Sequence, residues 1–111
     1  MMKIKKIRKP WGHELLFART KDYVGKILVI HKGEELSLQY HEQKEESIYV
    51  AHGKLEVEVG DENLVLNRGQ NLHIPPGTRH RFKALEDSEI FEVSTPHLED
   101  VVRLKDRYGR V

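Results

Sequence analysis

The stretches 33-GEELSLQYHEQKEESIYVAHG-53 and 69-GQNLHIPPGTRH-80 decide the fold of this chain. Glycine bounds the first stretch at both ends and opens the second, which also contains a Pro-Pro-Gly turn. Both therefore consist of short extended segments between turns. Within the first stretch, Gln39 and His41 lie two residues apart. On an extended strand, that spacing sends both side chains to the same face.

Two further side chains complete a group of metal-binding type. Glu46 follows His41 after a turn, and His80 begins a distant strand behind the Pro-Pro-Gly turn. Imidazole, carboxylate and amide groups together suit a borderline divalent metal. Because all four side chains can converge inside one small β structure, the spacing predicts a metal site formed by Gln39, His41, Glu46 and His80.

The chain around these stretches alternates with a period of two. Leu55, Val57 and Val59 alternate with charged residues, which predicts a strand with one buried face. Residues 60–63 then close a hairpin onto residues 64–66. About eight short strands at this pitch predict an all-β sandwich or barrel. Further strands are predicted at residues 26–30, 36–40, 72–74, 79–82 and 90–93. The tail, residues 98–105, is the only candidate for a helical turn or two.

Length and composition fit one small soluble domain. A chain of 111 residues is typical of a single domain, and 38% hydrophobic residues suffice for one compact β core. The 19 basic and 18 acidic residues leave a net charge of +1, which provides no field for nucleic acid or membrane. The sequence has no cysteine and no apolar run of signal-peptide or membrane-span length. We therefore expect a cytoplasmic location.

Basic residues gather at the start of the chain without an acidic one. We expect residues 1–9 to form a solvated, mobile arm rather than a binding site for a polyanion. The basic residues of this arm are Lys3, Lys5, Lys6, Arg8 and Lys9.

Written as spacings, the two stretches read G-x5-Q-x-H-x4-E-x6-G and G-x5-P-x-G-x2-H. They resemble the two motifs of the cupin family, with Gln39 in place of the first histidine. The closer resemblance is to the cupin-type mannose-6-phosphate isomerase domain, which is often fused behind mannose-1-phosphate guanylyltransferase. It extends from about residue 8 to the last residue. The matching segments are 9-KPWG-12, 36-LSLQYH-41, 74-IPPGT-78 with His80, 102-VRL-104 and 106-DRYGR-110.

This resemblance implies a single cupin domain over residues 1–111, folded as a double-stranded β-helix or jelly roll. The barrel core is expected at residues 24–94, behind the basic arm of residues 1–9. Residues 95–111 form a short C-terminal extension. We also expect a homodimer, because the sheets of such domains often pair and the basic arm needs somewhere to dock.

The resembled domain uses Gln, His, Glu and His as metal ligands, so the resemblance implies one divalent ion at the predicted site. Alternative assignments use His41 with Gln43, or Glu45 in place of Glu46, and both fit the spacing less well. A donor set without thiolate indicates a working site with open positions rather than a structural zinc site. It does not choose among Zn, Mn, Co, Fe and Ni.

The resemblance further implies interconversion of mannose 6-phosphate and fructose 6-phosphate by proton transfer through an enediol. Such a substrate needs a cationic group for its phosphate and a base beside the metal. The phosphate-binding candidates in the matching segments are Arg103, Arg110 and Lys9, for which ordinary surface charge is the alternative reading. The base stays open among Glu45, His31 and Lys44.

Several positions depart from the pattern of the isomerase domain. Glu35 stands where that pattern has arginine, Gln43 and Ser47 stand where it has histidines, and Ala84 replaces the asparagine of the second cupin motif. These departures leave an alternative function open. It is a cupin without isomerase activity, either a sugar-binding or sensing module or a small-molecule metalloenzyme of dioxygenase type.

Overall fold

The computed structural model describes residues 3–111, in which eleven β-strands and no helix form. A helix able to span a membrane is accordingly not found in this range. The strands are β1 (Lys5–Lys9), β2 (Gly12–Arg19), β3 (Val24–Ile30), β4 (Leu38–Tyr40), β5 (Glu46–His52), β6 (Lys54–Val59), β7 (Glu62–Asn67), β8 (Asn71–Ile74), β9 (His80–Ala84), β10 (Ser88–Ser94) and β11 (Val102–Lys105).

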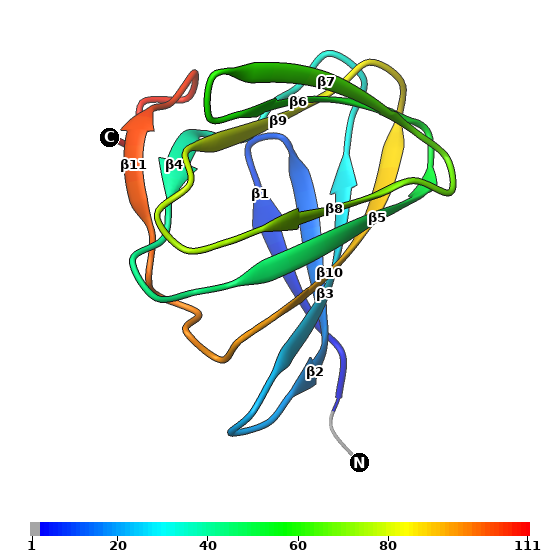
Figure 1. Ribbon diagram of the computed structural model, residues 1–111. Helices are drawn as coiled ribbons and strands as arrows, with labels where there is room; N and C mark the ends of the chain where they lie inside the picture. The colour runs from blue at the N-terminus through cyan, green and yellow to red at the C-terminus, as the bar shows by residue number, and fades with distance from the viewer. Residues whose placement is uncertain (1–2) are drawn as a thin grey trace.

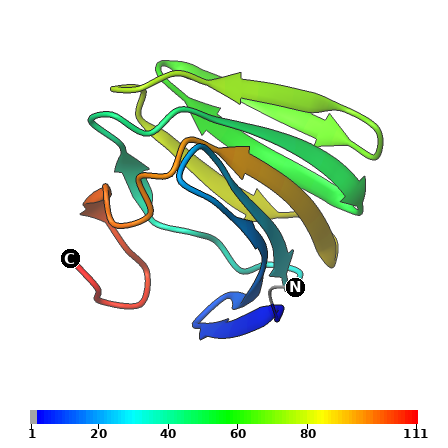
Figure 2. The same cartoon turned by 90° about the horizontal axis from the view of Figure 1, so that it is seen from below.

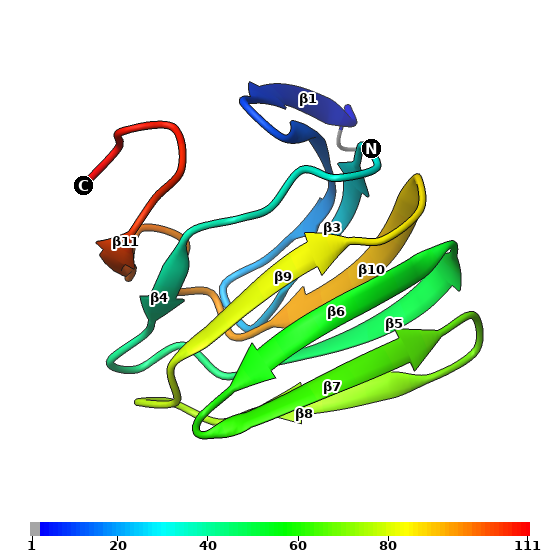
Figure 3. The ribbon, with the colours of Figure 1, turned by 90° about the horizontal axis from the view of Figure 1, so that it is seen from above.

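The strands form two antiparallel sheets that face each other (Figures 1 and 3). One sheet has the order β1-β2-β3-β10-β5-β8 and the other has the order β11-β4-β9-β6-β7. Strands distant in sequence are neighbours, as where β10 pairs with both β3 and β5. Such crossing between two facing sheets is the jelly-roll arrangement. The predicted all-β jelly roll is confirmed.

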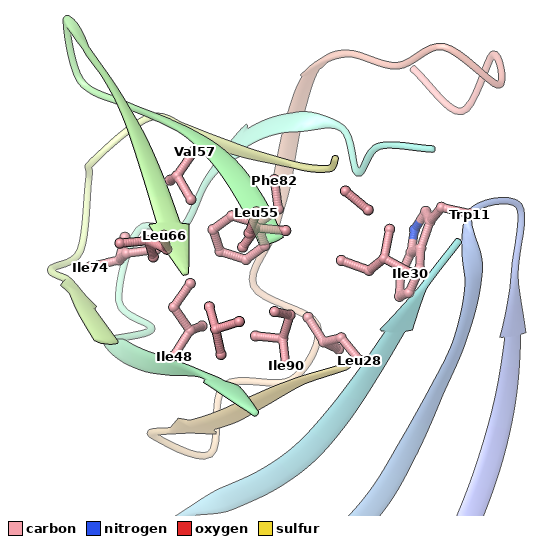
Figure 4. Packing of buried hydrophobic residues seen from close by; sticks show 12 residues of the cluster. Trp11, Leu28, Ile30, Ile48, Leu55, Val57, Leu66, Ile74, Phe82 and Ile90 are labelled. Carbon is pink, nitrogen blue, oxygen red and sulfur yellow. The ribbon is translucent and has the colours of Figure 1, made fainter. Parts of the chain in front are cut away.

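The interior of the sandwich changes character along its strands. On β5 the inward side chains change from Glu46 to Ile48, and on β9 they change from His80 to Phe82. The same change occurs along β3 and β10, so one half of the interior is apolar (Figure 4) and the other is polar. Further apolar members are Leu28, Ile30, Val50, Ala84 and Ile90, and further polar members are Lys26, Glu92 and Ser94.

The turn between β1 and β2 closes the apolar half. Trp11 is 2% exposed and lies beside Ile30 in Figure 4, and its carbonyl accepts a hydrogen bond from the backbone N–H of His31 at 3.0 Å. Gly12 permits this approach, because a Cβ there would lie 1.9 Å from the carbonyl oxygen of Val29. Burying a side chain as large as Trp11 stabilises the fold by roughly 1.5–3 kcal/mol or more.

Two sequence-based expectations at the chain ends are wrong. Residues 5–9 of the expected mobile arm form the edge strand β1, which pairs with β2 along its whole length; Met1 and Met2 lie outside the described residues. Residues 102–105 of the expected helical tail form β11, which pairs with β4. Both ends are held by backbone ladder bonds that a residue pattern does not display.

Candidate metal centre

Three of the four predicted ligands meet in the polar half of the interior. The Nε2 atom of His41 lies 3.2 Å from Oε1 of Glu46, and Nε2 of His80 lies 3.0 Å from the same oxygen. The ligand atoms of these three residues all lie within 4.8 Å of one another. Glu46 and His80 are the first residues of β5 and β9, and His41 directly follows β4. The centre therefore stands where three strands begin or end.

Backbone carbonyls fix the orientation of both imidazoles. Nδ1 of His41 donates to the carbonyl oxygen of Asp100 at 2.5 Å, and Nδ1 of His80 donates to that of Thr78 at 2.8 Å. Because a carbonyl only accepts, Nδ1 carries a proton in both rings, and each Nε2 is left directed at Glu46. This second-layer arrangement is the one that metal-binding histidines usually have.

The donor set fits a divalent ion. Nε2 of His80 is buried without a hydrogen-bond partner among the atoms of residues 3–111, and it faces a carboxylate oxygen that also only accepts. A cation between these atoms would satisfy both. Burial raises the pKa of Glu46, but its contacts with His41, His80 and Lys44 outweigh burial and hold that pKa well below the ordinary value. The carboxylate is thus ionised, as a ligand must be.

The fourth predicted ligand lies next to this group. Gln39 pairs in register with His80 between β4 and β9, and it lines the same pocket as His41. Its Oε1 accepts a hydrogen bond from Oγ of Ser37 at 2.7 Å. Gln39 and His41 thus share a face, as their spacing predicts, while ligation by Gln39 stays a prediction.

The alternative ligands and most of the base candidates lie away from His41, Glu46 and His80. The Glu45 side chain points outward and contacts Nε2 of His73 at 2.5 Å, with both side chains about half exposed. Gln43 and His31 are exposed, and His31 borders a separate hollow with His52 and Asp87. The structure therefore brings Glu46, not Glu45, to the histidines. Of the three base candidates it places only Lys44 beside them.

The three predicted phosphate-binding cations share one pocket with Gln39 and His41, although they come from opposite ends of the chain. Nε of Arg103 is buried and has no hydrogen-bond partner within the described part of the chain. Arg110 is held by two bonds from its side chain to the Asp106 carboxylate, at 2.9 and 2.8 Å. Burial lowers the pKa of Lys9, and repulsion from Lys26, Arg103 and Arg110 lowers it further against the attraction of Glu14. The pocket thus concentrates positive charge at one side of the metal centre.

A buried ion pair that the sequence analysis does not predict lines this pocket beside Glu46. Nζ of Lys44 lies 3.3 Å from Oε2 of Glu92 and 3.6 Å from Oε2 of Glu46. Burial and the charge of Glu46 raise the pKa of Glu92 to about 8, although Lys44 opposes this. The signal was present in the alternation of β10, where Glu92 shares the inward register of Ile90 while Phe91 and Val93 point outward.

A segment of the C-terminal extension holds the ligand loop in place. The Asp100 carboxylate accepts the backbone N–H groups of Glu42, Gln43 and Lys44 at 3.0, 2.7 and 2.9 Å. These bonds lower the pKa of Asp100 to about 2. Beyond it, β11 runs beside β4 (Figures 2 and 3). The extension therefore fixes both the backbone of residues 42–44 and the ring of His41.

Comparison with known proteins finds one family. The family described as "Cupin domain" matches residues 26–94. The chain is 39% identical over 78 residues to "Polyketide synthase CurC" of Streptomyces cyaneus, a match that covers 68% of this chain and 50% of that protein. It is 30% identical over 112 residues to "Mannose-1-phosphate guanylyltransferase ManC" of Salmonella typhimurium, covering 96% of this chain and 23% of that protein. The chain thus spans half or less of the length of these relatives.

Solved structures agree on the fold. KdgF from Halomonas superposes with a TM-score of 0.77 at 26% identity, covering 84% of this chain and 86% of KdgF. The nucleoside dehydratase Pac13 of Streptomyces superposes with a TM-score of 0.80 at 12% identity, covering 92% of this chain and 85% of Pac13. At 12% identity the second likeness concerns the fold alone.

Proposed function

This chain belongs to the cupin family, and on that premise we propose that it is a metal-dependent hexose-phosphate isomerase with mannose 6-phosphate as its substrate. One observation carries the proposal. The metal-type donors His41, Glu46 and His80 adjoin a pocket in which Lys9, Arg103 and Arg110 gather. A hexose phosphate offers a carbonyl to the first group and a dianion to the second.

Arg103 is the best phosphate ligand of the three cations. Its buried Nε has no bond to another group in residues 3–111, whereas Arg110 is engaged by Asp106. Leaving a buried donor without an acceptor costs about 1–3 kcal/mol, and more for a charged group. An anion that accepts a hydrogen bond from Nε of Arg103 would offset this cost. Lys9 adds a second positive charge from the opposite chain end.

The chain supplies candidates for proton transfer at the metal centre. A bound divalent ion would polarise the sugar carbonyl and stabilise negative charge on its oxygen. Lys44 and Glu92 line the pocket beside Glu46. They are the ionisable side chains best placed to carry a proton between the two carbons next to that oxygen.

The mannose-1-phosphate guanylyltransferases support a phosphosugar substrate, because the likeness covers 96% of this chain. A second candidate rests on the higher identity to CurC and on the carboxylates of Glu14 and Glu92 in the pocket. It is a metalloenzyme that acts on a polyketide-type small molecule without a phosphate.

A coupled assay separates the two candidates. Protein loaded in turn with Zn, Mn, Co, Fe or Ni is expected to convert mannose 6-phosphate to fructose 6-phosphate. Arg103→Ala should raise KM at least tenfold with unchanged metal content, because a charged hydrogen bond to phosphate contributes about 1.5–3 kcal/mol. Lys105→Ala is the matched control, since Lys105 is exposed on the same strand. Absence of turnover on every hexose phosphate tested, in protein with one metal per chain, would favour the second candidate.

A further inference from the structure

The wall that the six-stranded sheet gives to the pocket carries a buried ion pair. Glu14 lies on the inward side of β2, and Lys26 lies on the inward side of β3. Nζ of Lys26 donates to Oε1 of Glu14 at 3.1 Å, and the two side chains are 12% and 11% exposed. Both residues line the pocket that holds the three candidate phosphate ligands. The proton-transfer and phosphate roles assigned above use neither of them.

Stability alone does not account for this pair. Glu14 is flanked in register by Ile7 on β1 and Leu28 on β3, so its neighbours in the inward row are apolar. Removing two charges from water has a cost that can exceed their mutual attraction. Replacing such a pair with apolar residues often leaves a fold equally stable or makes it more stable. A charged pair at this position therefore indicates a contact with a ligand.

Glu14 has an acceptor to offer to that ligand. Oε1 is occupied by Lys26, whereas Oε2 makes no hydrogen bond or ion pair within residues 3–111. The buried side-chain atoms without a partner in that range are Nε2 of His80 and Nε of Arg103, so the unpartnered Oε2 is accessible to solvent. Since a carboxylate only accepts, the matching group on the ligand is a hydrogen-bond donor.

The two ends of a bound ligand would lie along the facing sheet. Arg103, Gln39 and His80 are successive register partners on β11, β4 and β9. Two strand spacings amount to about 10 Å. A ligand that reaches from the metal centre to Arg103 therefore has several bonds between its two ends, and the middle of the ligand needs contacts of its own.

Glu14 is close to both ends. On one side, Lys26 is the register partner of Glu92, and Glu92 contacts Lys44 beside the metal centre. On the other side, the charge of Glu14 acts on Lys9. Burial lowers the pKa of Lys9, and Glu14 is the charge that opposes this effect. A ligand held at both ends therefore passes Glu14.

We propose that Glu14, held in place by Lys26, binds hydroxyl groups and selects a polyhydroxylated phosphate ester as the ligand of this pocket. The inference rests on the phosphosugar function proposed above and names the part of the sugar that the six-stranded sheet recognises. A hexose phosphate carries hydroxyl groups on the carbons between its carbonyl and its phosphate, and these hydroxyls donate to a carboxylate. A chain without hydroxyls would leave the carboxylate desolvated and without a donor, which disfavours its binding.

The carboxylate of Glu14 is compatible with a phosphate dianion in the same pocket. Its charge is balanced by Lys26, so the pair adds no net charge. Lys9 and Arg103 keep their positive charge for the phosphate. An acid in this pocket thus fits a ligand that has both a dianion and hydroxyl donors.

Calorimetric titration with two phosphate esters tests the inference. Mannitol phosphate carries hydroxyl groups along its chain, whereas hexyl phosphate has the same number of carbons and no hydroxyl group. Neither ester has a carbonyl, so binding is measured without turnover. The wild-type protein should bind mannitol phosphate at least about tenfold more tightly than hexyl phosphate, because hydrogen bonds to a charged acceptor are about twice as strong as neutral ones.

Glu14→Leu combined with Lys26→Met removes the pair without changing the net charge of the pocket. This double variant should raise the Kd of mannitol phosphate at least about tenfold and leave that of hexyl phosphate within about twofold. Glu58→Leu combined with Arg81→Met is the matched control, because it removes an ion pair of 2.9 Å outside the pocket. The control should change neither Kd.

Circular dichroism on each variant separates a lost contact from unfolding. If the double variant loses its strand signal, Glu14→Gln replaces it and should reduce the ratio of the two Kd values at least about threefold. Equal Kd values of the wild-type protein for the two esters would overturn the role of Glu14 and leave the phosphate site standing. A folded double variant that keeps the wild-type ratio would also overturn it. If the wild-type protein binds neither ester at millimolar concentration, the proposed phosphosugar function fails and this inference fails with it.

Discussion

His80 and Arg103 carry the two buried side-chain nitrogens that find no hydrogen-bond partner within residues 3–111. Nε2 of His80 presents a lone pair and requires a cation or a proton, whereas Nε of Arg103 presents a proton and requires an anion or another acceptor. Burying each of these atoms without a hydrogen-bond partner lowers the stability of the fold by about 1–3 kcal/mol. The two atoms therefore mark two ends of a binding site. A cation is expected beside Nε2 of His80, and an anion is expected beside Nε of Arg103.

Removing either histidine should abolish stoichiometric metal binding. His41→Ala and His80→Ala each delete one donor and leave Glu46 with a single imidazole. Elemental analysis after dialysis should show one divalent ion per wild-type chain and only traces in both variants. Added metal should raise Tm of the wild type alone, since a ligand at 100 times its Kd stabilises by about 2.7 kcal/mol.

His73→Ala serves as the control for that experiment, because His73 is exposed and contacts only Glu45 among the acids of the described chain. It should keep full metal content. Retention of metal by both His41→Ala and His80→Ala would show the ligand assignment to be wrong.

At the scale of elements, the loop between β4 and β5 and the C-terminal extension behave as one unit. The loop carries His41 and Lys44, and Asp100 collects three of its backbone N–H groups. No regular ladder holds these loop residues. The position of the candidate metal ligand His41 therefore depends on a carboxylate nearly sixty residues further along the chain.

The contribution of Asp100 to stability should depend on pH with a defined sign. Its pKa is lowered to about 2 from 3.8 by the three backbone donors, so its stabilising effect is complete above about pH 4 and is lost as pH falls through 2. Asp100→Asn should lower Tm at pH 7, and the difference from wild type should shrink as pH approaches 2.

Thermal melts of the two proteins between pH 2 and pH 7 measure this difference. Asp61→Asn is a matched change at an exposed residue of the β6–β7 turn and should give no comparable effect. A constant gap between Asp100→Asn and wild type across the whole range would contradict the assigned role.

These elements also show what a residue pattern can predict. The alternation of apolar and charged residues predicts β6, and the glycine and proline residues predict the turns around β8 and β9. The all-β class and the inward face of these strands therefore follow from the local sequence. β1 and β11 are edge strands whose side chains are mostly half-exposed or exposed. They lack a strong period, and their pairing partners are decided by tertiary contact. Glu92 was overlooked because a charged residue in a strand is ordinarily read as outward-facing.

The candidate metal ligands could be predicted from the sequence more fully than the other residues of the pocket. Spacing alone brought Gln39, His41, Glu46 and His80 to one face or turn, and three of them do meet. The pairing of Lys44 with Glu92 joins residues 48 positions apart. No local spacing encodes such a contact, which exists only because β5 and β10 are neighbours.

For the molecule as a whole, the two ends of the chain meet at one pocket. Lys9 ends β1, while Arg103 and Arg110 belong to the C-terminal extension, and all three line that pocket. These segments have no direct strand pairing with each other, since β1 pairs with β2 and β11 pairs with β4. An anion bound there would be their shared contact.

Anion binding should therefore protect both chain ends together. In hydrogen–deuterium exchange, mannose 6-phosphate should slow exchange at residues 5–9 and 102–110 simultaneously, because opening either end would expose the bound phosphate. Lys9→Ala should weaken the protection at both segments, whereas Lys32→Ala, exposed outside the pocket, should not. Protection confined to one end would refute a pocket shared by the two.

Because the interior is divided into an apolar half and a polar half, the residues that stabilise the fold are largely different from those that determine the chemistry of the site. Ile30, Val50 and Ile90 belong to the apolar core and do not line the pocket, whereas Trp11 and Leu28 belong to both. Substitutions among the polar side chains that line the pocket leave the apolar contacts of Ile30, Val50 and Ile90 in place. During evolution, substitutions at a few polar inward positions can therefore change the reaction that the site supports, while the apolar core keeps the fold.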